Sequence, residues 1–253
     1  MDFFWVSTDD RVDLATGLHG PAHAPVALVI AHGFSMTSAD RRLASLAALL
    51  AEAGRAVYTF DFRGHGRSGG TSTLGDLEIA DLEAVVRRAR QQGHEKVVVI
   101  GASMGGFVAL RHAALLGGAD AVIAISTPAM WGASPRLRAR ALVAAVHSRF
   151  GRRILSARGT RVDDAFRAPT ASPADLARHI TIPVAIVHGD RDPYVPTDDA
   201  VLLHERLAGY RRLVILPRFG HAETAYTREF APILDSLVDE LLQSAAPSSR
   251  SRD

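Results

Sequence analysis

A serine flanked by glycines is the sequence feature that most constrains the fold of this chain. Residues 101–105 read Gly-Ala-Ser-Met-Gly and follow an apolar, β-branched run at 97–100. A second apolar run, 107–116, has the spacing of a helix. We therefore expect a buried strand, a sharp turn and a helix in succession, with Ser103 strained and exposed at the turn. Glycine suits positions 101 and 105 because a Cβ there would collide with neighbouring backbone.

The five-residue pattern does not identify a nucleophile by itself, because the chain contains it twice. Residues 66–70 also match, but they continue as Gly-Gly-Thr-Ser-Thr at 69–73, which cannot open a helix. We therefore interpret Ser68 as a loop serine and Ser103 as the candidate nucleophile.

The order of the apolar segments indicates an α/β fold. From residue 26 onward, buried runs of strand length alternate with runs of helical spacing, apart from one stretch near the middle of the chain. This order predicts a mostly parallel, eight-stranded sheet with helices on both faces and antiparallel strands at its N-terminal edge. The expected strands are 3–7, 12–18, 26–30, 56–61, 97–100, 121–126, 184–190 and 212–216, and the expected helices are 40–52, 75–92, 107–116 and 223–243.

The stretch without strands, 128–181, is expected to be a helical insertion that caps the carboxyl edge of the sheet. Helices are predicted over 131–155 and 173–179. The two flanking parts of the chain, 1–127 and 182–243, then form one core.

Arginine is concentrated in this predicted cap. Residues 128–180 carry ten arginines against three aspartates. Two interpretations are open: a solvated helical face in an arginine-rich protein, or a basic rim that attracts anionic substrates. The last residues, 244–253, are rich in serine and arginine and are expected to be disordered.

The composition excludes several classes of protein. The chain has no cysteine, which rules out disulfides and thiolate metal sites. Its formal net charge is only +2, so no strong field attracts nucleic acid or a membrane surface. No apolar run is long enough to span a bilayer, and the first residues lack the features of a signal peptide. We expect a soluble, cytoplasmic protein without a nucleic-acid partner or stable membrane insertion, and the sequence leaves its oligomeric state open.

A serine hydroxyl needs a general base before it can act as a nucleophile. Of the eleven histidines, His221 stands in the loop between the last strand and the closing helix. Loops of this kind, at the carboxyl ends of parallel strands, bind ligands in such folds. His32 and His65 lie in tight glycine-containing turns, where we expect them to shape their loops by hydrogen bonding. His221 is therefore the predicted base.

The loop 189–196 supplies the acid that would orient this base. It contains Asp190, which ends a strand, and Asp192, which lies further into the loop and can face His221. We favour Asp192. The order Ser103, Asp192, His221 along the chain is the one found in strand–turn–helix serine enzymes of this architecture.

Five features together resemble the α/β-hydrolase superfamily, and the resemblance covers about residues 1–127 and 182–243. It is greatest with the capped esterases and with members similar to monoacylglycerol lipase or to serine aminopeptidases. The features are His32-Gly33-Phe34, the glycine-rich loop 63–68, the turn 101–105, the loop 189–196 and Gly220-His221.

The resemblance implies a serine hydrolase that needs no cofactor or metal and cleaves a small-molecule carboxylic ester through an acyl-enzyme. Ser103 would be the nucleophile, with His221 as general base and Asp192 as the orienting acid. The backbone N–H groups of Phe34 and Met104 would form the oxyanion hole.

One such triad serves several reactions, and the predicted cap would select the substrate. Thioesterase, lactonase, C–C bond hydrolase, perhydrolase and aminopeptidase activities therefore remain alternatives, as does a ligand-binding protein with little turnover. A serine in place of an aspartate nucleophile argues against haloalkane dehalogenase and epoxide hydrolase chemistry.

Overall fold

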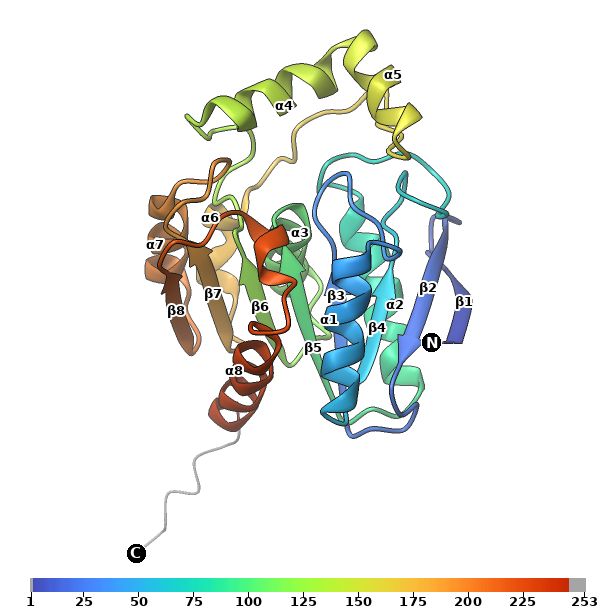
Figure 1. Ribbon diagram of the computed structural model, residues 1–253, viewed down its shortest axis with the longest axis vertical. Helices are drawn as coiled ribbons and strands as arrows, with labels where there is room; N and C mark the ends of the chain where they lie inside the picture. Colours follow the sequence, from blue (N-terminus) through green and yellow to red (C-terminus); the bar gives the residue numbers. More distant parts are fainter. Residues whose placement is uncertain (1, 246–253) are drawn as a thin grey trace, which may run out of the picture.

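One β-sheet runs through the molecule, with helices on both of its faces (Figure 1). The computed structural model describes residues 2–245. Of the tail predicted to be disordered, 244–253, Ser244 belongs instead to the last helix, and residues 246–253 lie outside the described residues. The strands are β1 (Asp2–Ser7), β2 (Asp13–His19), β3 (Val26–Ala31), β4 (Ala56–Phe60), β5 (Lys96–Ala102), β6 (Ala121–Ile125), β7 (Val184–Gly189) and β8 (Arg211–Leu216). The helices are α1 (Arg41–Glu52), α2 (Glu78–Gln91), α3 (Met104–Leu115), α4 (Leu137–His147), α5 (Arg149–Ala157), α6 (Pro173–Leu176), η1 (Ala177–His179), α7 (Thr197–Arg206), η2 (Ala222–Ala225) and α8 (Ala231–Ser244).

The strand order β1-β2-β4-β3-β5-β6-β7-β8 confirms the predicted α/β-hydrolase sheet. The pairs β1–β2 and β2–β4 are antiparallel and lie at the N-terminal edge, as expected. The strands from β4 to β8 pair in parallel. Every residue of β4, β6 and β7 is buried, which explains why these strands read as uninterrupted apolar runs.

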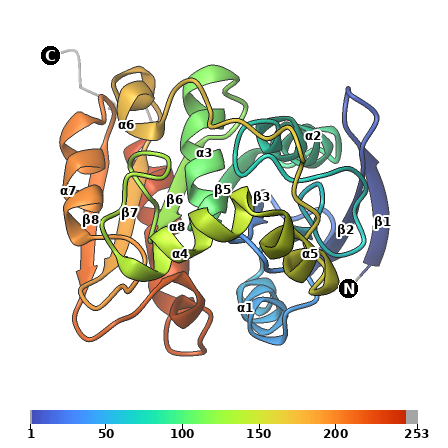
Figure 2. The same cartoon turned by 90° about the horizontal axis from the view of Figure 1, so that it is seen from above.

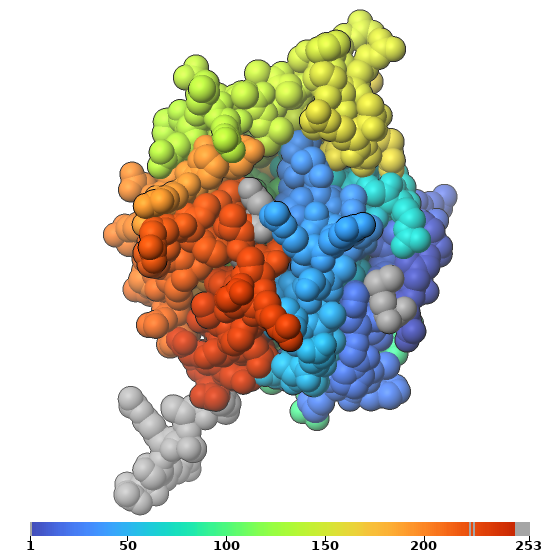
Figure 3. Space-filling model, viewed as in Figure 1, coloured from blue at the N-terminus to red at the C-terminus, as the bar shows by residue number. Residues whose placement is uncertain are grey.

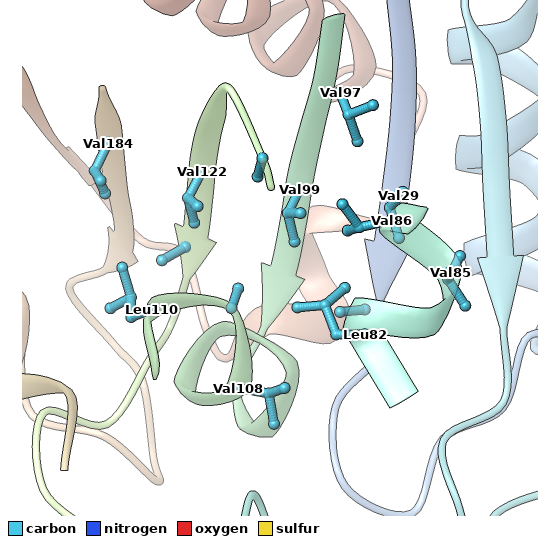
Figure 4. Close-up of a cluster of buried hydrophobic side chains, with 14 of the residues drawn as sticks. Val29, Leu82, Val85, Val86, Val97, Val99, Val108, Leu110, Val122 and Val184 are labelled. Atoms are coloured by element: carbon cyan, nitrogen blue, oxygen red, sulfur yellow. The ribbon is translucent and has the colours of Figure 1, made fainter. Parts of the chain in front are cut away.

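Successive residues of the parallel strands enter two different hydrophobic cores, because side chains alternate across a sheet. Val29, Val99 and Val122 pack with helices α2 and α3 on one face (Figure 4). Leu28 and Ile100 pack with α1 and α8 on the other face. The view from above shows these two layers of helices on either side of the sheet (Figure 2). Both cores hold the strands rigidly and so fix the positions of the loops at their carboxyl ends.

Several helices differ from the prediction. The helix expected over 131–155 is divided into α4 and α5 because Ser148 is extended (φ −90°, ψ 131°) and its side chain caps α5. The helix expected over 223–243 is divided into η2 and α8, and α8 continues to Ser244. Helix α7 was not predicted, since its sequence buries only Ala200 and Leu203 and has weak helical periodicity.

Helices α4 and α5 lie above the sheet, across the ends of its strands (Figures 1 and 2). The space-filling view shows them as a layer on top of the core (Figure 3). Helices α6 and η1, from the same stretch of sequence, pack instead beside α3 and α7. The division into a core and a cap over 128–181 remains a prediction.

Candidate active site

Ser103 lies at a strained turn between β5 and α3. Its backbone has φ 52° and ψ −113°, in a region that residues with a Cβ rarely adopt. A Cβ on Gly101 would lie 2.5 Å from the carbonyl oxygen of Gly105, and one on Gly105 would collide with the carbonyl of Ala31. The Ser103 carbonyl accepts a hydrogen bond from the Phe107 N–H at 3.0 Å, so α3 begins directly after the serine. The predicted strand, turn and helix are thus present.

Ser68, the serine of the second Gly-x-Ser-x-Gly match, is hydrogen-bonded within the fold. It is buried, its hydroxyl donates to the Asp61 carbonyl at 2.5 Å, and its Oγ accepts from the Ala15 N–H at 2.9 Å. These bonds tie the loop to β2 and leave the hydroxyl engaged. The structure therefore separates the two serines in the way their sequence contexts predict.

The predicted acid and base lie in contact. Nδ1 of His221 is 2.7 Å from Oδ2 of Asp192. The other carboxylate oxygen, Oδ1, accepts from the backbone N–H groups of Tyr194 at 2.8 Å and Val195 at 2.9 Å. Burial opposes ionisation of Asp192, but the bond to His221 and these two amides hold its pKa below the ordinary value. An ionised Asp192 therefore holds Nδ1 of His221, which leaves Nε2 for another partner.

The other candidate acid and bases have different surroundings. The side chain of Asp190 is exposed. Two buried histidines are engaged in structural contacts away from Ser103: His94 lies 2.9 Å from the Tyr58 hydroxyl, and His112 lies 2.7 Å from a Glu83 oxygen. Of these residues, Asp192 and His221 are the two that the structure brings into contact.

Two backbone amides near Ser103 are free to donate. Met104 is the first residue of α3, so its N–H has no acceptor within the helix. Among residues 2–245, the N–H of Phe34 has no hydrogen-bond acceptor. A Cβ placed on Gly33, the residue before Phe34, would lie 3.5 Å from the Ser103 Cβ, so this backbone packs against the serine. Preorganised amides of this kind suit an oxygen that gains negative charge.

Two buried histidines hold the loop that carries Phe34. Nδ1 of His32 donates to the Gly33 carbonyl at 2.8 Å, and its Nε2 accepts from the Phe62 N–H at 3.0 Å. Burial lowers the pKa of His32 to about 3 and also lowers the pKa of His65. Both rings are therefore neutral near pH 7, which allows each to donate from one nitrogen and accept at the other. This agrees with the loop-shaping role expected for them.

Ser103, His221 and the residues that carry the two free amides, Phe34 and Met104, line one cavity of about 480 Å³. Loops that follow β3, β5, β7 and β8 contribute Phe34, Ser103, Tyr194 and His221 to its wall, and Leu142 is one of four α4 residues that cover it. Its size is in the usual range for small-molecule sites. Most of the lining side chains are apolar, so the cavity suits a ligand with a large hydrophobic part. The complete lining is Gly33, Phe34, Ser35, Met36, Asp40, Arg42, Leu74, Ser103, Met104, Phe107, Pro128, Met130, Trp131, Gly132, Ser134, Ala139, Leu142, Val143, Val146, Tyr194, Val195, His221 and Ala222.

Several cavity residues were not predicted from the sequence. Leu74 enters through a turn whose backbone conformation its residue type does not signal, and the α4 side chains enter through tertiary packing. None of the ten arginines between 128 and 180 belongs to this lining. Four of them instead line a separate, outer cavity on α5: Arg149, Arg152, Arg153 and Arg161.

Within residues 2–245, no three or more His, Asp and Glu side chains converge as ligands of a metal ion would. None of the helices in that range combines the length and apolar character needed to cross a bilayer.

Comparison with known sequences gives a family match and several related proteins. The family described as "Serine aminopeptidase, S33", a hydrolase family, matches residues 22–174. A monoacylglycerol lipase of Mycolicibacterium smegmatis is 31% identical over 216 residues, covering 72% of this chain and 75% of the lipase. An uncharacterized protein of Bacillus subtilis, YqkD, is 29% identical over 238 residues, covering 88% of this chain and 76% of that protein.

Solved structures share the fold at lower identity. The esterase Pf2001 of Pyrococcus furiosus superposes with a TM-score of 0.74 at 22% identity, covering 96% of this chain and 91% of the esterase. An esterase of Exiguobacterium antarcticum gives a TM-score of 0.75 at 19% identity, covering 94% and 98% of the two chains. With the family match over 22–174, the sheet order and the strained serine turn, this chain belongs to the serine aminopeptidase S33 family of the α/β-hydrolase serine hydrolases.

Proposed function

We propose that this protein hydrolyses carboxylic esters through an acyl-enzyme formed on Ser103. The observation that carries the proposal is the 2.7 Å contact between Asp192 and His221, since His221 shares a cavity with Ser103. A serine that shares a cavity with an imidazole, which itself contacts an ionised carboxylate, supplies nucleophile, base and orienting group. The monoacylglycerol lipase and esterase relatives are consistent with an ester as substrate.

In the first half of the reaction, Nε2 of His221 takes the proton from Ser103 Oγ as this oxygen attacks the ester carbonyl carbon. The carbonyl oxygen becomes an anion and is held by the amides of Phe34 and Met104. When the tetrahedral intermediate collapses, the C–O bond to the alcohol breaks, and the His221 proton passes to the leaving alcohol. The acyl group remains on Ser103.

In the second half, water replaces the alcohol. His221 takes a proton from water as its oxygen attacks the acyl carbon, and the proton then returns to Ser103 Oγ as the acid leaves. Asp192 stays ionised throughout, because its role is to hold the Nδ1–H tautomer and to stabilise the imidazolium. Its lowered pKa supports this role.

The cavity favours a neutral ester over the substrate of an aminopeptidase. An aminopeptidase must bind the α-ammonium group of its substrate, which calls for an available carboxylate. Among the described residues that line the cavity, Asp40 is the single acidic residue, and its Oδ1 already accepts from the amides of Arg42 and Leu43 at the start of α1. Apolar side chains make up most of the remaining wall, as an acyl chain requires.

Turnover of nitrophenyl esters tests the proposal. Ser103 and Ser68, the serines of the two Gly-x-Ser-x-Gly matches, form a matched pair for substitution. The Ser103→Ala variant should lose at least about 10³-fold in kcat while remaining folded. Ser68→Ala, the change in the second match, should keep kcat within a few-fold even though it loses two buried hydrogen bonds. Thermal unfolding of both variants reports their folding. Equal activity of Ser103→Ala and wild-type enzyme would refute the assignment.

A further inference from the structure

The turn at 72–76 presents a leucine to the active-site cavity in an unfavourable conformation. Leu74 has φ 53°, in the left-handed region that glycine adopts far more readily than leucine. It lines the cavity together with Ser103 and Phe107. Strained residues persist where the surrounding structure holds them, and they concentrate at functional sites. The strained backbone of Leu74 must therefore be held by contacts from neighbouring residues.

A buried carboxylate holds this turn from within. Glu78, the first residue of α2, is fully buried, and its side chain accepts four hydrogen bonds. The donors are Ser72 Oγ at 2.7 Å, Thr73 N–H at 2.8 Å, Thr73 Oγ1 at 2.7 Å and Gly75 N–H at 2.9 Å. Because Glu78 binds the backbone N–H groups of Thr73 and Gly75, on both sides of Leu74, the turn is fixed in this conformation.

A buried arginine on α3 also binds this turn. Arg111 donates to the carbonyl groups of Gly75 and Asp76. Gly75 itself has φ 105°, and a Cβ there would lie 2.8 Å from the ring of Phe107. The backbone next to Leu74 thus packs directly on Phe107, one helical turn after Ser103.

The chemistry of ester cleavage indicates which end of the cavity would hold the alcohol and which the acyl group. His221 must give its proton to the leaving alcohol, so the alcohol lies beside His221 and beside Tyr194, whose ring centre is 4.9 Å from the imidazole. The acyl group extends away from His221, past the oxyanion amides. Leu74 lies in the segment between β4 and α2, and β4 is on the opposite side of β5, the strand that leads to Ser103, from β7 and β8.

We propose that Leu74 is a specificity-determining residue that closes the acyl end of the cavity and limits the length of the acyl chain. The inference rests on the proposed ester hydrolysis and extends it by naming the residue that selects among acyl groups. Because the turn is held by Glu78 and Arg111, a change of side chain at 74 alters the space available without releasing the backbone.

Two ester series test this proposal. In the first, the acyl group of nitrophenyl esters varies from acetate to palmitate. In the second, the acyl group is fixed as butyrate and the alcohol varies from methyl to octyl. For Leu74→Ala, kcat/KM for long relative to short acyl chains should rise about tenfold or more, and for Leu74→Trp it should fall by a similar factor. The alcohol series should keep its wild-type ratios.

Leu77→Ala is the matched control, because Leu77 is 49% exposed, lies three residues further on and is absent from the cavity lining. Its ratios in both series should equal those of the wild type. Leu74→Gly gives a second variant that relieves the positive φ while opening the pocket, and it should shift the acyl ratio in the same direction as Leu74→Ala.

Unchanged acyl ratios in the Leu74 variants, or a shift in the alcohol series instead, would overturn the inference and leave the proposed function intact. Wild-type enzyme with no turnover of any ester, or with turnover that survives Ser103→Ala, would overturn both.

Discussion

The imidazole of His65 accepts a hydrogen bond from the backbone N–H of Ser35 at 3.3 Å. Its other nitrogen, Nδ1, donates to the Arg63 carbonyl at 3.0 Å, which fixes the tautomer. Ser35 follows Phe34 directly and has φ 59°, so this bond holds a strained part of the loop that carries one of the two free amides. A buried histidine thus connects the loop after β4 with the loop that would bind the oxyanion.

Removing this bond should impair turnover more than binding. In His65→Phe the ring remains but the acceptor is lost, so the Phe34 amide should be less well placed. We expect kcat to fall about 10- to 100-fold, less than the loss from deleting an oxyanion donor outright, with a smaller change in KM. His94→Phe is the control, since His94 is also buried and hydrogen-bonded, but its partners are the Tyr58 hydroxyl and the Ala24 carbonyl instead of the loop that carries Phe34. A proportional loss of kcat in both variants would point to a general effect on folding.

Stability should decrease in acid because His32 is neutral in the folded protein. Burial lowers its pKa from 6.5 to about 3, so between these values the unfolded chain binds a proton that the folded protein does not. Lowering the pH therefore stabilises the unfolded chain, by about 2 kcal/mol from pH 6.5 to pH 5 for this group. Urea unfolding of the wild type and of His32→Asn, which cannot titrate, measures the difference. Identical pH slopes in the two proteins would contradict the assignment.

Asp192 and Asp190 form a matched pair for testing the role of the acid. Asp192→Asn should lower kcat about 10³- to 10⁴-fold, because an amide at this position no longer stabilises the Nδ1–H tautomer or the imidazolium. Asp190→Asn changes an exposed side chain two residues away and should leave kcat within about twofold. Steady-state rates on one nitrophenyl ester are sufficient. An active Asp192→Asn enzyme would show that another group orients His221.

The buried carboxylate of Glu78 should contribute to stability through its four donors. In Glu78→Gln an NH₂ group would meet some of these donors, leaving buried groups unsatisfied at a cost of about 2–3 kcal/mol. For a domain of this size, the melting temperature should fall by about 5–10 °C. Glu95→Gln, at an exposed position, should leave it unchanged. Calorimetry of the two variants checks this, and an unchanged melting temperature for Glu78→Gln would contradict it.

The central strands of the sheet could be predicted because β3 to β7 are almost entirely buried. Runs such as Val26–Ile30 or Val97–Ile100 contain no polar residue, so their extent and order could be identified without tertiary information. The same order places Ser103, Asp192 and His221 after β5, β7 and β8, and parallel strands bring their carboxyl ends to one edge. The resemblance adds the backbone amides of Phe34 and Met104 as the expected oxyanion hole.

The walls of the cavity could not be predicted in this way. Leu74 enters through a positive φ that Glu78 and Arg111 maintain, and leucine carries no signal for that conformation. The break between α4 and α5 depends on the extended backbone of Ser148, within a run whose composition suits one long helix. Such features depend on contacts between segments far apart in the sequence, and they shape the part of the site that meets the substrate.

Covalent labelling by a fluorophosphonate probe tests the central claim most directly, because the probe phosphonylates a serine only where a base and an oxyanion site activate it. We expect one adduct per chain, located on Ser103 by peptide mass spectrometry, absent from Ser103→Ala and retained in Ser68→Ala. A folded wild-type protein that takes up no probe, or an adduct on another serine, would contradict it.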